Sequence, residues 1–268
     1  MIEKTISIKS NRNTKIKCTV IDSEFDNSKL VLFFHGFKAD RTEGGRFLSV
    51  AKNLASLGVN SIMMSFAGCT DSDEDFINYT LTNNLDDIEL CYQYMLDNYS
   101  IDKNHIGVIG YSMGARLASI FINKHSEVNC LALWAGFCIE GFGSDKFLGG
   151  NVIDMYNEAN IKGYCNFYNA FDNTTIKINK ELLDDITKYN PYDGLNKYDG
   201  NVIVVHGDKD ITVDLSIGKL AYQQLNNAKN KKLVIIKDAN HGFGLWDNHD
   251  EQSKQLVDET SSYFEEYL

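Results

Sequence analysis

A serine stands between two glycines in the run GYSMG, residues 110–114. Residues 105–110, HIGVIG, have the apolar character of a buried strand, and the residues after the serine have the spacing of an amphipathic helix. A sharp turn from strand to helix brings two backbones close together, and Gly110 and Gly114 leave the room that such a turn needs. The hydroxyl of Ser112 then stands at the sheet edge, where the helix N-terminus favours a developing negative charge. We therefore predict that Ser112 is a nucleophile.

A serine hydroxyl is a weak nucleophile unless a histidine takes its proton and a carboxylate holds that histidine. His241, in the run KDANHGFG, follows the last expected strand. Catalytic groups of open parallel sheets gather where the strands end, so we expect His241 on the same edge as Ser112. Asp210 follows the preceding strand and lies further into its loop than Asp208, so we expect Asp210 to hold the histidine and Asp208 to brace the turn. His249 is the alternative base.

The negative charge that develops on a substrate carbonyl oxygen needs hydrogen-bond donors, which together form an oxyanion hole. One expected donor is the backbone N–H of Met113, the residue after the nucleophile. The second is the N–H of Phe37, in the turn after the apolar run KLVLFFHG of residues 29–36. His35 and Gly36 are expected to support this turn without taking part in the chemistry.

The elements that must position these residues alternate along the chain. Residues 14–21 alternate between polar and apolar side chains, as in a half-exposed strand. Apolar runs typical of strands cover residues 29–36, 59–66, 105–110, 130–134, 201–207 and 232–237. Amphipathic stretches typical of helices cover residues 45–58, 85–99, 113–125, 214–226 and 251–267. This alternation predicts an α/β fold with a mostly parallel central sheet and helices on both of its faces.

Residues 138–198 break this alternation and contain no clear sheet strand. The segment is rich in glycine, asparagine and aromatic residues, namely Phe142, Phe147, Tyr156, Tyr164, Phe167, Tyr168 and Phe171. An insertion of this length inside a compact fold is usually a lid or a binding element. We therefore expect residues 1–268 to form a single domain that carries a lid or cap at 138–198. The alternative is a helical excursion without a role in the site.

Composition restricts the partners of the protein. With 37 acidic and 26 basic residues, the formal net charge is −11, which disfavours nucleic acid and anionic membrane surfaces. The first residues, MIEKTISIKSNRNTKIKC, lack the apolar region of a signal peptide, and no apolar run has the length of a membrane span. None of the six cysteines has C-x-x-C spacing, so we expect reduced thiols in a cytoplasmic protein. The oligomeric state stays open, a homodimer included.

Two charged features have simple interpretations. The acidic residues between Asp71 and Asp75 lack the spacing and the glycine of a calcium-binding loop, so we expect a solvated loop and no metal site. Arg116, four residues after the nucleophile, is expected to serve helix packing or a surface ion pair.

The runs HGF, GYSMG, HGDKD and NHGF resemble the oxyanion, nucleophile, acid and base segments of the α/β-hydrolase superfamily of serine hydrolases, across nearly the whole chain. The order Ser112, Asp210, His241 is also the order of that superfamily. Within it, the chain is similar to small bacterial esterases related to feruloyl and cinnamoyl esterases, through HGF, the insertion before the acid strand, and YNPYDGL. The resemblance implies an α/β-hydrolase fold and cleavage of hydroxycinnamic acid esters through an acyl-enzyme, without a cofactor.

Taken together, the sequence predicts a serine carboxylesterase that acts on small-molecule esters, with an aromatic or medium-chain acyl group beneath the insertion. A serine peptidase or acyl-peptidase of the same fold is one alternative, although we find no obvious recognition site for a peptide amine or carboxylate. A thioesterase is a second alternative, because the same triad permits it. The non-enzymatic alternative is a hydrolase fold that only binds its ligand.

Overall fold

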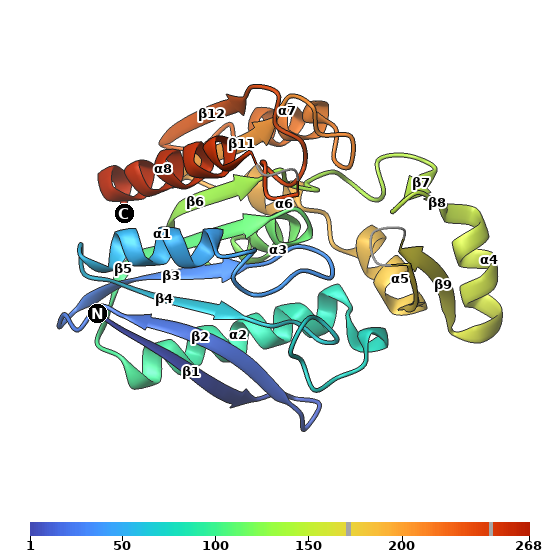
Figure 1. The fold of residues 1–268 in the computed structure, drawn as a ribbon, viewed down its shortest axis with the longest axis horizontal. Coiled ribbons are helices and arrows are strands. Elements are labelled where there is room, and N and C mark those ends of the chain that lie inside the picture. The colour runs from blue at the N-terminus through green and yellow to red at the C-terminus, as the bar shows by residue number, and fades with distance from the viewer. Residues whose placement is uncertain (170–172, 247–248) are drawn as a thin grey trace.

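The computed structural model describes residues 1–169, 173–246 and 249–268. An eight-stranded sheet crosses the molecule in the order β1-β2-β4-β3-β5-β6-β11-β12 (Figure 1). Its strands are β1 (Ile2–Lys9), β2 (Lys15–Asp22), β3 (Ser28–Phe34), β4 (Val59–Met64), β5 (Ile101–Tyr111), β6 (Val128–Trp134), β11 (Asn201–Gly207) and β12 (Asn230–Ile236). All pairs from β4 to β12 are parallel, whereas β2 pairs antiparallel with β4 and with β1. The sheet is mostly parallel, as predicted.

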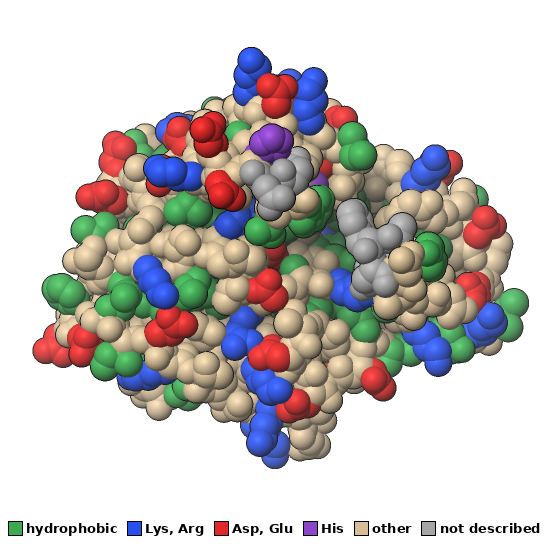
Figure 2. Space-filling view, viewed as in Figure 1, with side chains coloured by type: hydrophobic (Ala, Val, Ile, Leu, Met, Phe, Trp, Pro, Cys, Tyr) green, Lys and Arg blue, Asp and Glu red, His purple; other side chains and the backbone are tan. Residues whose placement is uncertain are grey.

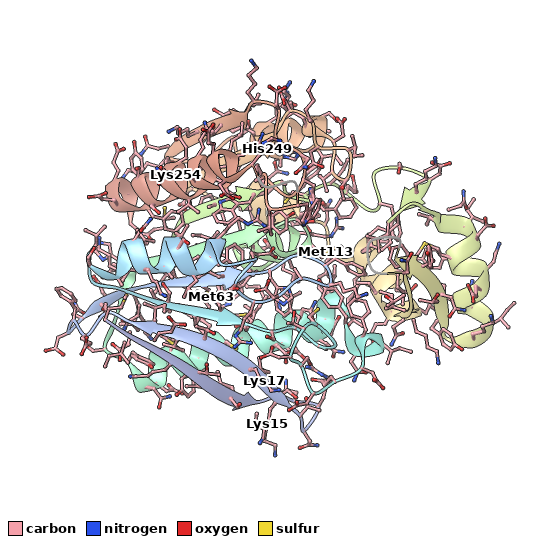
Figure 3. The ribbon with its side chains drawn as sticks, in the orientation of Figure 1. Lys15, Lys17, Met63, Met113, His249 and Lys254 are labelled. Atoms are coloured by element: carbon pink, nitrogen blue, oxygen red, sulfur yellow. The ribbon has the colours of Figure 1, made fainter. Side chains whose placement is uncertain are left out.

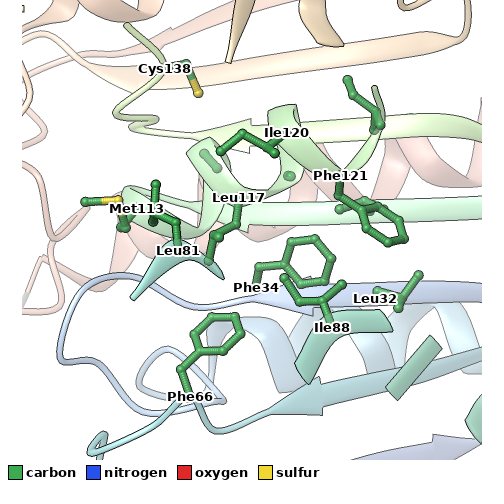
Figure 4. Close-up of a cluster of buried hydrophobic side chains, with 14 of the residues drawn as sticks. Leu32, Phe34, Phe66, Leu81, Ile88, Met113, Leu117, Ile120, Phe121 and Cys138 are labelled. Atoms are coloured by element: carbon green, nitrogen blue, oxygen red, sulfur yellow. The ribbon is translucent and has the colours of Figure 1, made fainter. Parts of the chain in front are cut away.

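Helices cover both faces of this sheet (Figure 1). One face packs against α1 (Arg46–Ala55) and α8 (Asp250–Tyr267), which contribute Phe47 and Phe264 to its core. The other face packs against α2 (Leu81–Asn98), α3 (Met113–Phe121) and α7 (Leu215–Gln224). Figure 4 shows part of this second core, where Phe34 of the sheet lies among Leu117 and Phe121 of α3. The start of α3, where Ser112 lies, therefore rests on a packed apolar layer.

Most of the segment between β6 and β11 forms a lobe beside the carboxyl ends of the strands, whereas its last helix, α6 (Tyr192–Leu195), lies against the body (Figure 1). Its described residues contribute no strand to the eight-stranded sheet. They form two small antiparallel pairs and three helices: β7 (Lys146–Phe147), β8 (Gly150–Asn151), α4 (Val152–Lys162), β9 (Tyr164–Asn169), β10 (Thr174–Asn179), α5 (Lys180–Lys188) and α6 (Tyr192–Leu195). Phe171, one of the aromatic residues that the sequence singles out, lies outside the described residues. That the lobe acts as a lid stays a prediction.

Two features near the β1 edge differ from the sequence prediction. Strand β1 has no counterpart in the prediction, because every one of its side chains keeps some exposure and its apolar periodicity is weak. The acidic loop is not simply solvated: Glu74 is buried and accepts hydrogen bonds from the Arg12 guanidinium at 2.8 Å. Nearby, Arg41 donates to Asp71 at 2.5 Å. Glu74 thus holds the loop after β4 against the turn between β1 and β2. Asp71 holds the same loop against the segment that follows the turn after β3.

All six cysteines are buried thiols, and the Sγ atoms of Cys18 and Cys91 lie 3.6 Å apart. Within the described ranges, no helix combines the length and the apolar character that crossing a membrane requires. The cytoplasmic location expected from the sequence stays a prediction.

Candidate active site

Ser112 lies on a sharp turn between β5 and α3, with φ 54° and ψ −114°. This is a strained conformation for a residue with a side chain, and such strain concentrates at functional sites. A Cβ atom on Gly114 would lie 1.9 Å from the carbonyl oxygen of Phe34, and one on Gly110 would lie 2.4 Å from the oxygen of Gly114. Only glycine fits at either position, so the two glycines of the motif have the steric role that the sequence predicts.

The loops after β5, β11 and β12 bring Ser112, Asp210 and His241 together. The Nε2 atom of His241 lies 3.0 Å from Ser112 Oγ, and its Nδ1 atom lies 2.7 Å from Asp210 Oδ2. The ring nitrogen that faces a carboxylate carries the N–H of a neutral imidazole, which here is Nδ1. The Nε2 atom is then free to accept a hydrogen bond from the hydroxyl of Ser112. His249, the alternative base, is the exposed residue just before α8, and Figure 3 labels it above Met113, the residue that follows Ser112.

Asp210 is held as an ionised carboxylate. Its Oδ1 atom accepts hydrogen bonds from the backbone N–H groups of Thr212 and Val213, both at 2.9 Å. Burial alone would raise the pKa of Asp210, but hydrogen bonds from His206 and His241 outweigh it and lower this pKa to about 2. Asp210 therefore keeps its negative charge throughout the pH range in which a histidine acts as a base.

His206 is a site residue that the sequence analysis did not assign. It is fully buried in β11, and its Nε2 atom lies 2.8 Å from the carbonyl oxygen of Val213 and 3.3 Å from Asp210 Oδ2. It thereby joins the strand to the loop that carries the acid. The available signal was one polar residue at the end of an otherwise apolar strand. Asp208 accepts a hydrogen bond from the backbone of Asp238 at 2.6 Å, which is the bracing role expected for it.

The turn after β3 lies against the nucleophile. A Cβ atom on Gly36 would be 3.4 Å from the Cβ of Ser112, so no side chain separates the two segments. His35 is fully buried; its Nε2 atom accepts from the N–H of Phe66 at 3.0 Å, and its Nδ1 atom lies 2.8 Å from the oxygen of Gly36. Burial lowers the pKa of His35 to about 4, so the ring is neutral and its Nδ1–H donates to Gly36.

This arrangement fixes the peptide plane that carries the N–H of Phe37, because that N–H and the oxygen of Gly36 belong to one peptide group. In the described part of the chain, neither the N–H of Phe37 nor that of Met113 donates to a protein acceptor. Both N–H groups remain available for a substrate oxygen beside Ser112.

A cavity of about 660 Å³ opens onto Ser112 and His241. Its apolar lining comes from the body and from the insertion, through Phe37, Leu148, Phe167, Leu245 and Trp246. The rings of Phe37 and Phe167 meet edge to face at 6.3 Å, where the body and the insertion adjoin. Figure 2 shows hydrophobic side chains gathered around the hollow between these two parts. Of the other insertion aromatics, Phe142 and Phe147 are buried within the lobe, and Tyr168 is exposed.

Arg116 was predicted to serve either helix packing or a surface ion pair, and its burial excludes the surface ion pair. Its side chain is fully buried, one helical turn after Ser112. The guanidinium donates to five backbone carbonyls at 2.6–3.3 Å, those of Phe137, Ile139, Gly141, Ile186 and Tyr189. Three of these carbonyls lie where the chain enters the insertion and two lie at Ile186 and Tyr189 toward its end, so Arg116 joins both parts to α3. No group of three or more His, Cys, Asp or Glu side chains among the described residues is arranged to hold a metal ion.

Residues 45–268 match the model of the prolyl oligopeptidase family, and this range includes Ser112, Asp210 and His241. The chain belongs to the prolyl oligopeptidase family. It is therefore a hydrolase by family, and the match leaves out only the first 44 residues, which include the HGF turn. An uncharacterised protein of Acanthamoeba polyphaga mimivirus is 22% identical to this family member over 239 residues, covering 86% of this chain and 73% of its own.

Solved structures confirm the predicted α/β-hydrolase fold of this family member. Est1E from Butyrivibrio proteoclasticus with bound ferulic acid is similar with a TM-score of 0.81 and 20% identity, over 98% of each chain. The esterase domain of a Rhodothermus marinus protein is similar with a TM-score of 0.68 and 15% identity, over 100% of this chain and 99% of its own. A Pyrococcus furiosus esterase is similar with a TM-score of 0.67 and 19% identity, over 99% of this chain and 91% of its own.

Proposed function

We propose that this protein is a serine carboxylesterase that hydrolyses small-molecule esters with an aromatic acyl group. The observation that carries the proposal is the chain of contacts from Ser112 through His241 to Asp210, 3.0 Å and 2.7 Å long, at the wall of an apolar cavity. A hydroxyl, an imidazole and an ionised carboxylate in this order activate a serine for acyl transfer.

The reaction begins when Ser112 Oγ bonds to the ester carbonyl carbon while its proton passes to His241 Nε2. The N–H groups of Phe37 and Met113 donate to the oxygen that becomes negative. The bond to the alcohol oxygen then breaks, and His241 returns its proton to that oxygen as the alcohol leaves. Water attacks the acyl-enzyme by the same route, with His241 again first accepting and then donating the proton. Asp210 stabilises the protonated ring throughout.

The cavity lining supports an aromatic acyl group. Phe37 of the body and Phe167 of the insertion meet at the cavity wall, and aromatic surfaces of this kind pack well against a flat ring. The similarity to Est1E, which was solved with ferulic acid, supports the same substrate class.

Peptide-bond hydrolysis is the second candidate, because the family is named for peptidases. The described chain has one eight-stranded sheet and one inserted lobe, so any restriction on substrate size would come from that lobe alone. The cavity wall is mainly apolar around the nucleophile, which suits an aryl or alkyl ester better than a charged peptide end.

Labelling with a fluorophosphonate probe tests the nucleophile. We expect the wild type to be labelled and Ser112→Ala to stay unlabelled, with an unchanged melting temperature and with ester turnover lower by about four orders of magnitude or more. Near-normal turnover in Ser112→Ala would overturn the proposal.

A substrate panel on the wild type tests the substrate class. The panel contains acetyl, octanoyl and feruloyl esters of one alcohol, together with a feruloyl anilide. We expect the feruloyl ester to give the highest kcat/KM. Equal values for the three esters would argue against the aromatic acyl group, and faster cleavage of the anilide would favour the peptidase.

A further inference from the structure

A buried ion pair lies beneath the cavity, between the oxyanion turn and the loop of the histidine. Its members are Glu43, 4% exposed, just before α1, and Arg46, 5% exposed, the first residue of α1. Both line the cavity that holds Ser112. The reaction outlined above gives neither of them a role, yet burying two charged groups is costly unless each has well-placed partners.

Glu43 holds the oxyanion turn. Its Oε1 atom accepts a hydrogen bond from the N–H of Gly36 at 2.6 Å. The carbonyl of Gly36 is held from the other side by His35, at 2.8 Å. Glu43 and His35 thus fix both peptide groups of Gly36, and the second of these groups carries the N–H of Phe37.

Arg46 holds the loop of the histidine. Its Nη1 atom donates to the carbonyl oxygen of Gly242 at 2.7 Å, next to His241. Its guanidinium carbon lies 5.1 Å from the ring centre of Tyr111, and the Tyr111 hydroxyl donates to the carbonyl oxygen of His241 at 2.8 Å. Arg46 therefore touches both the nucleophile turn and the base loop.

The two side chains are joined to each other. Arg46 Nη2 lies 3.4 Å from Glu43 Oε2, and Arg46 Nε donates to the backbone oxygen of Glu43 at 3.0 Å. One continuous set of contacts therefore runs from Gly36 through the ion pair to Gly242. It links three loops that come from distant parts of the chain, and the reaction depends on their relative placement.

We propose that Glu43 and Arg46 are positioning residues of the esterase reaction, which hold the oxyanion turn and the His241 loop in register with Ser112. The inference rests on the proposed function, because it concerns the same site. Displacing a reacting group by about 1 Å lowers turnover by about a hundredfold, so the ion pair acts on kcat more than on KM.

The pair also makes activity depend on the charge of Glu43. The charged and titratable groups that face Glu43 are Arg46 and Asp40 from its own segment, Tyr111 from β5, and Cys69 and Tyr79 from the loop after β4. Burial raises the pKa values of Cys69, Tyr79 and Tyr111, so these three groups stay neutral.

Burial also raises the pKa of Glu43 to about 7, against the opposing effect of Arg46 and of the Gly36 N–H. The ion pair is therefore complete only above about pH 7. Protonation of Glu43 removes its charge pairing with Arg46, so we expect turnover to fall as pH drops through about 7.

The test compares wild type with Glu43→Gln on a feruloyl ester and an acetyl ester across pH. Glutamine keeps an oxygen for the Gly36 N–H and removes the charge. We expect kcat to fall by about tenfold to a hundredfold on both esters with KM within a factor of about two. The ratio of wild-type kcat to variant kcat should shrink as pH falls through about 7, because the wild-type carboxyl group then loses the charge that glutamine lacks. Glu259→Gln, which removes an equivalent charge from the surface pair with Lys232, serves as the matched control.

Arg46→Lys is the second variant, and it keeps the charge but cannot reach Glu43, Gly242 and Tyr111 together. We expect a lower kcat in this variant, and this result stands even where Glu43→Gln fails to fold. Unchanged kcat in the folded variants, with a ratio of wild-type to Glu43→Gln kcat that does not vary with pH, would overturn the positioning role. A wild type that resists the fluorophosphonate and cleaves no ester would instead overturn the proposed function, and the positioning role with it.

Discussion

Two buried arginines hold two regions of this molecule in different ways. At the catalytic edge, Arg46 pairs with a carboxylate, Glu43, and ties loops that follow separate strands. At the base of the insertion, Arg116 binds five backbone carbonyls, and no carboxylate pairs with it in the described ranges of the chain. Burial lowers the pKa of Arg116 to about 10, which still leaves it charged near neutral pH.

The two arginines differ in whether their partners change charge with pH. Carbonyl groups do not titrate, so the contacts of Arg116 are constant over the pH range in which the protein would work. The partner of Arg46 does titrate, so the catalytic edge changes with pH while the base of the insertion does not. Under the proposed function, we therefore expect variants of Arg116 to change substrate preference and variants of Arg46 or Glu43 to change turnover.

The largest expected effect on stability comes from Arg116→Met. Five carbonyls lose a charged donor, and we expect the free energy of unfolding to fall by about 3 kcal/mol. Hydrogen exchange should accelerate at residues 137–141 and 186–189 more than in β5 or β6. In kinetics, kcat/KM on a feruloyl ester should fall by about tenfold while that on an acetyl ester changes less. Equal losses on both esters, or exchange that accelerates uniformly, would show that Arg116 supports the whole fold and not the insertion in particular.

The second prediction concerns how the stability contributed at the two arginine sites depends on pH, and its expected effect is smaller. The pKa of Glu43 is raised in the folded protein, to about 7 from 4.5, so the native state binds more protons than the unfolded state between these values. The contribution of Glu43 to stability is therefore complete below pH 4.5 and is lost as pH rises through about 7.

Chemical denaturation at a series of pH values measures this. The stability of wild type relative to Glu43→Gln should fall by on the order of 2 kcal/mol from pH 4.5 to 8, whereas the stability relative to Arg116→Met should stay level. A level difference for Glu43→Gln would mean that the carboxyl group does not titrate in this window.

The smallest effect concerns the contact where the two regions meet. Phe167→Ala removes the ring that faces Phe37 across the cavity, and we expect a loss of about 1 kcal/mol in kcat/KM for a feruloyl ester relative to an acetyl ester. Tyr168→Ala, at the neighbouring position of the same strand but 59% exposed, is the matched control and should leave this ratio unchanged. The same loss in both variants would place the effect in the strand and not in the ring.

The sequence was most informative where burial imposes a strict pattern. Strands such as β3, β4 and β11 are buried on both faces, and their uninterrupted apolar runs were visible without a structure. Strand β1 was missed because it lies at an edge and all its side chains keep some exposure. The small strands of the insertion were missed because their pairing depends on a turn and on neighbours rather than on a run of apolar residues.

The residues of the site also differ in how well the sequence could predict them. Ser112, Asp210 and His241 could be placed from the ends of their strands, because parallel strands end at one edge and chain order limits the choices. The roles of Glu43, Arg46 and Arg116 could not be predicted, because each also binds backbone atoms of another segment, and backbone atoms leave no trace in residue type. His206 differed from its apolar neighbours, but only the distances to Val213 and Asp210 show its role.

The burial of every cysteine has a practical consequence. A thiol placed on the surface would be the sole site that maleimide or nitroxide reagents reach, with no native residue removed beforehand. Ile161 on α4 and Ile211 in the loop after β11 are 85% and 96% exposed, so cysteines there would accept one spin label on the insertion and one on the body. The distance distribution between the two labels, measured by pulsed electron resonance with and without a substrate analogue, would report directly on how far the insertion moves.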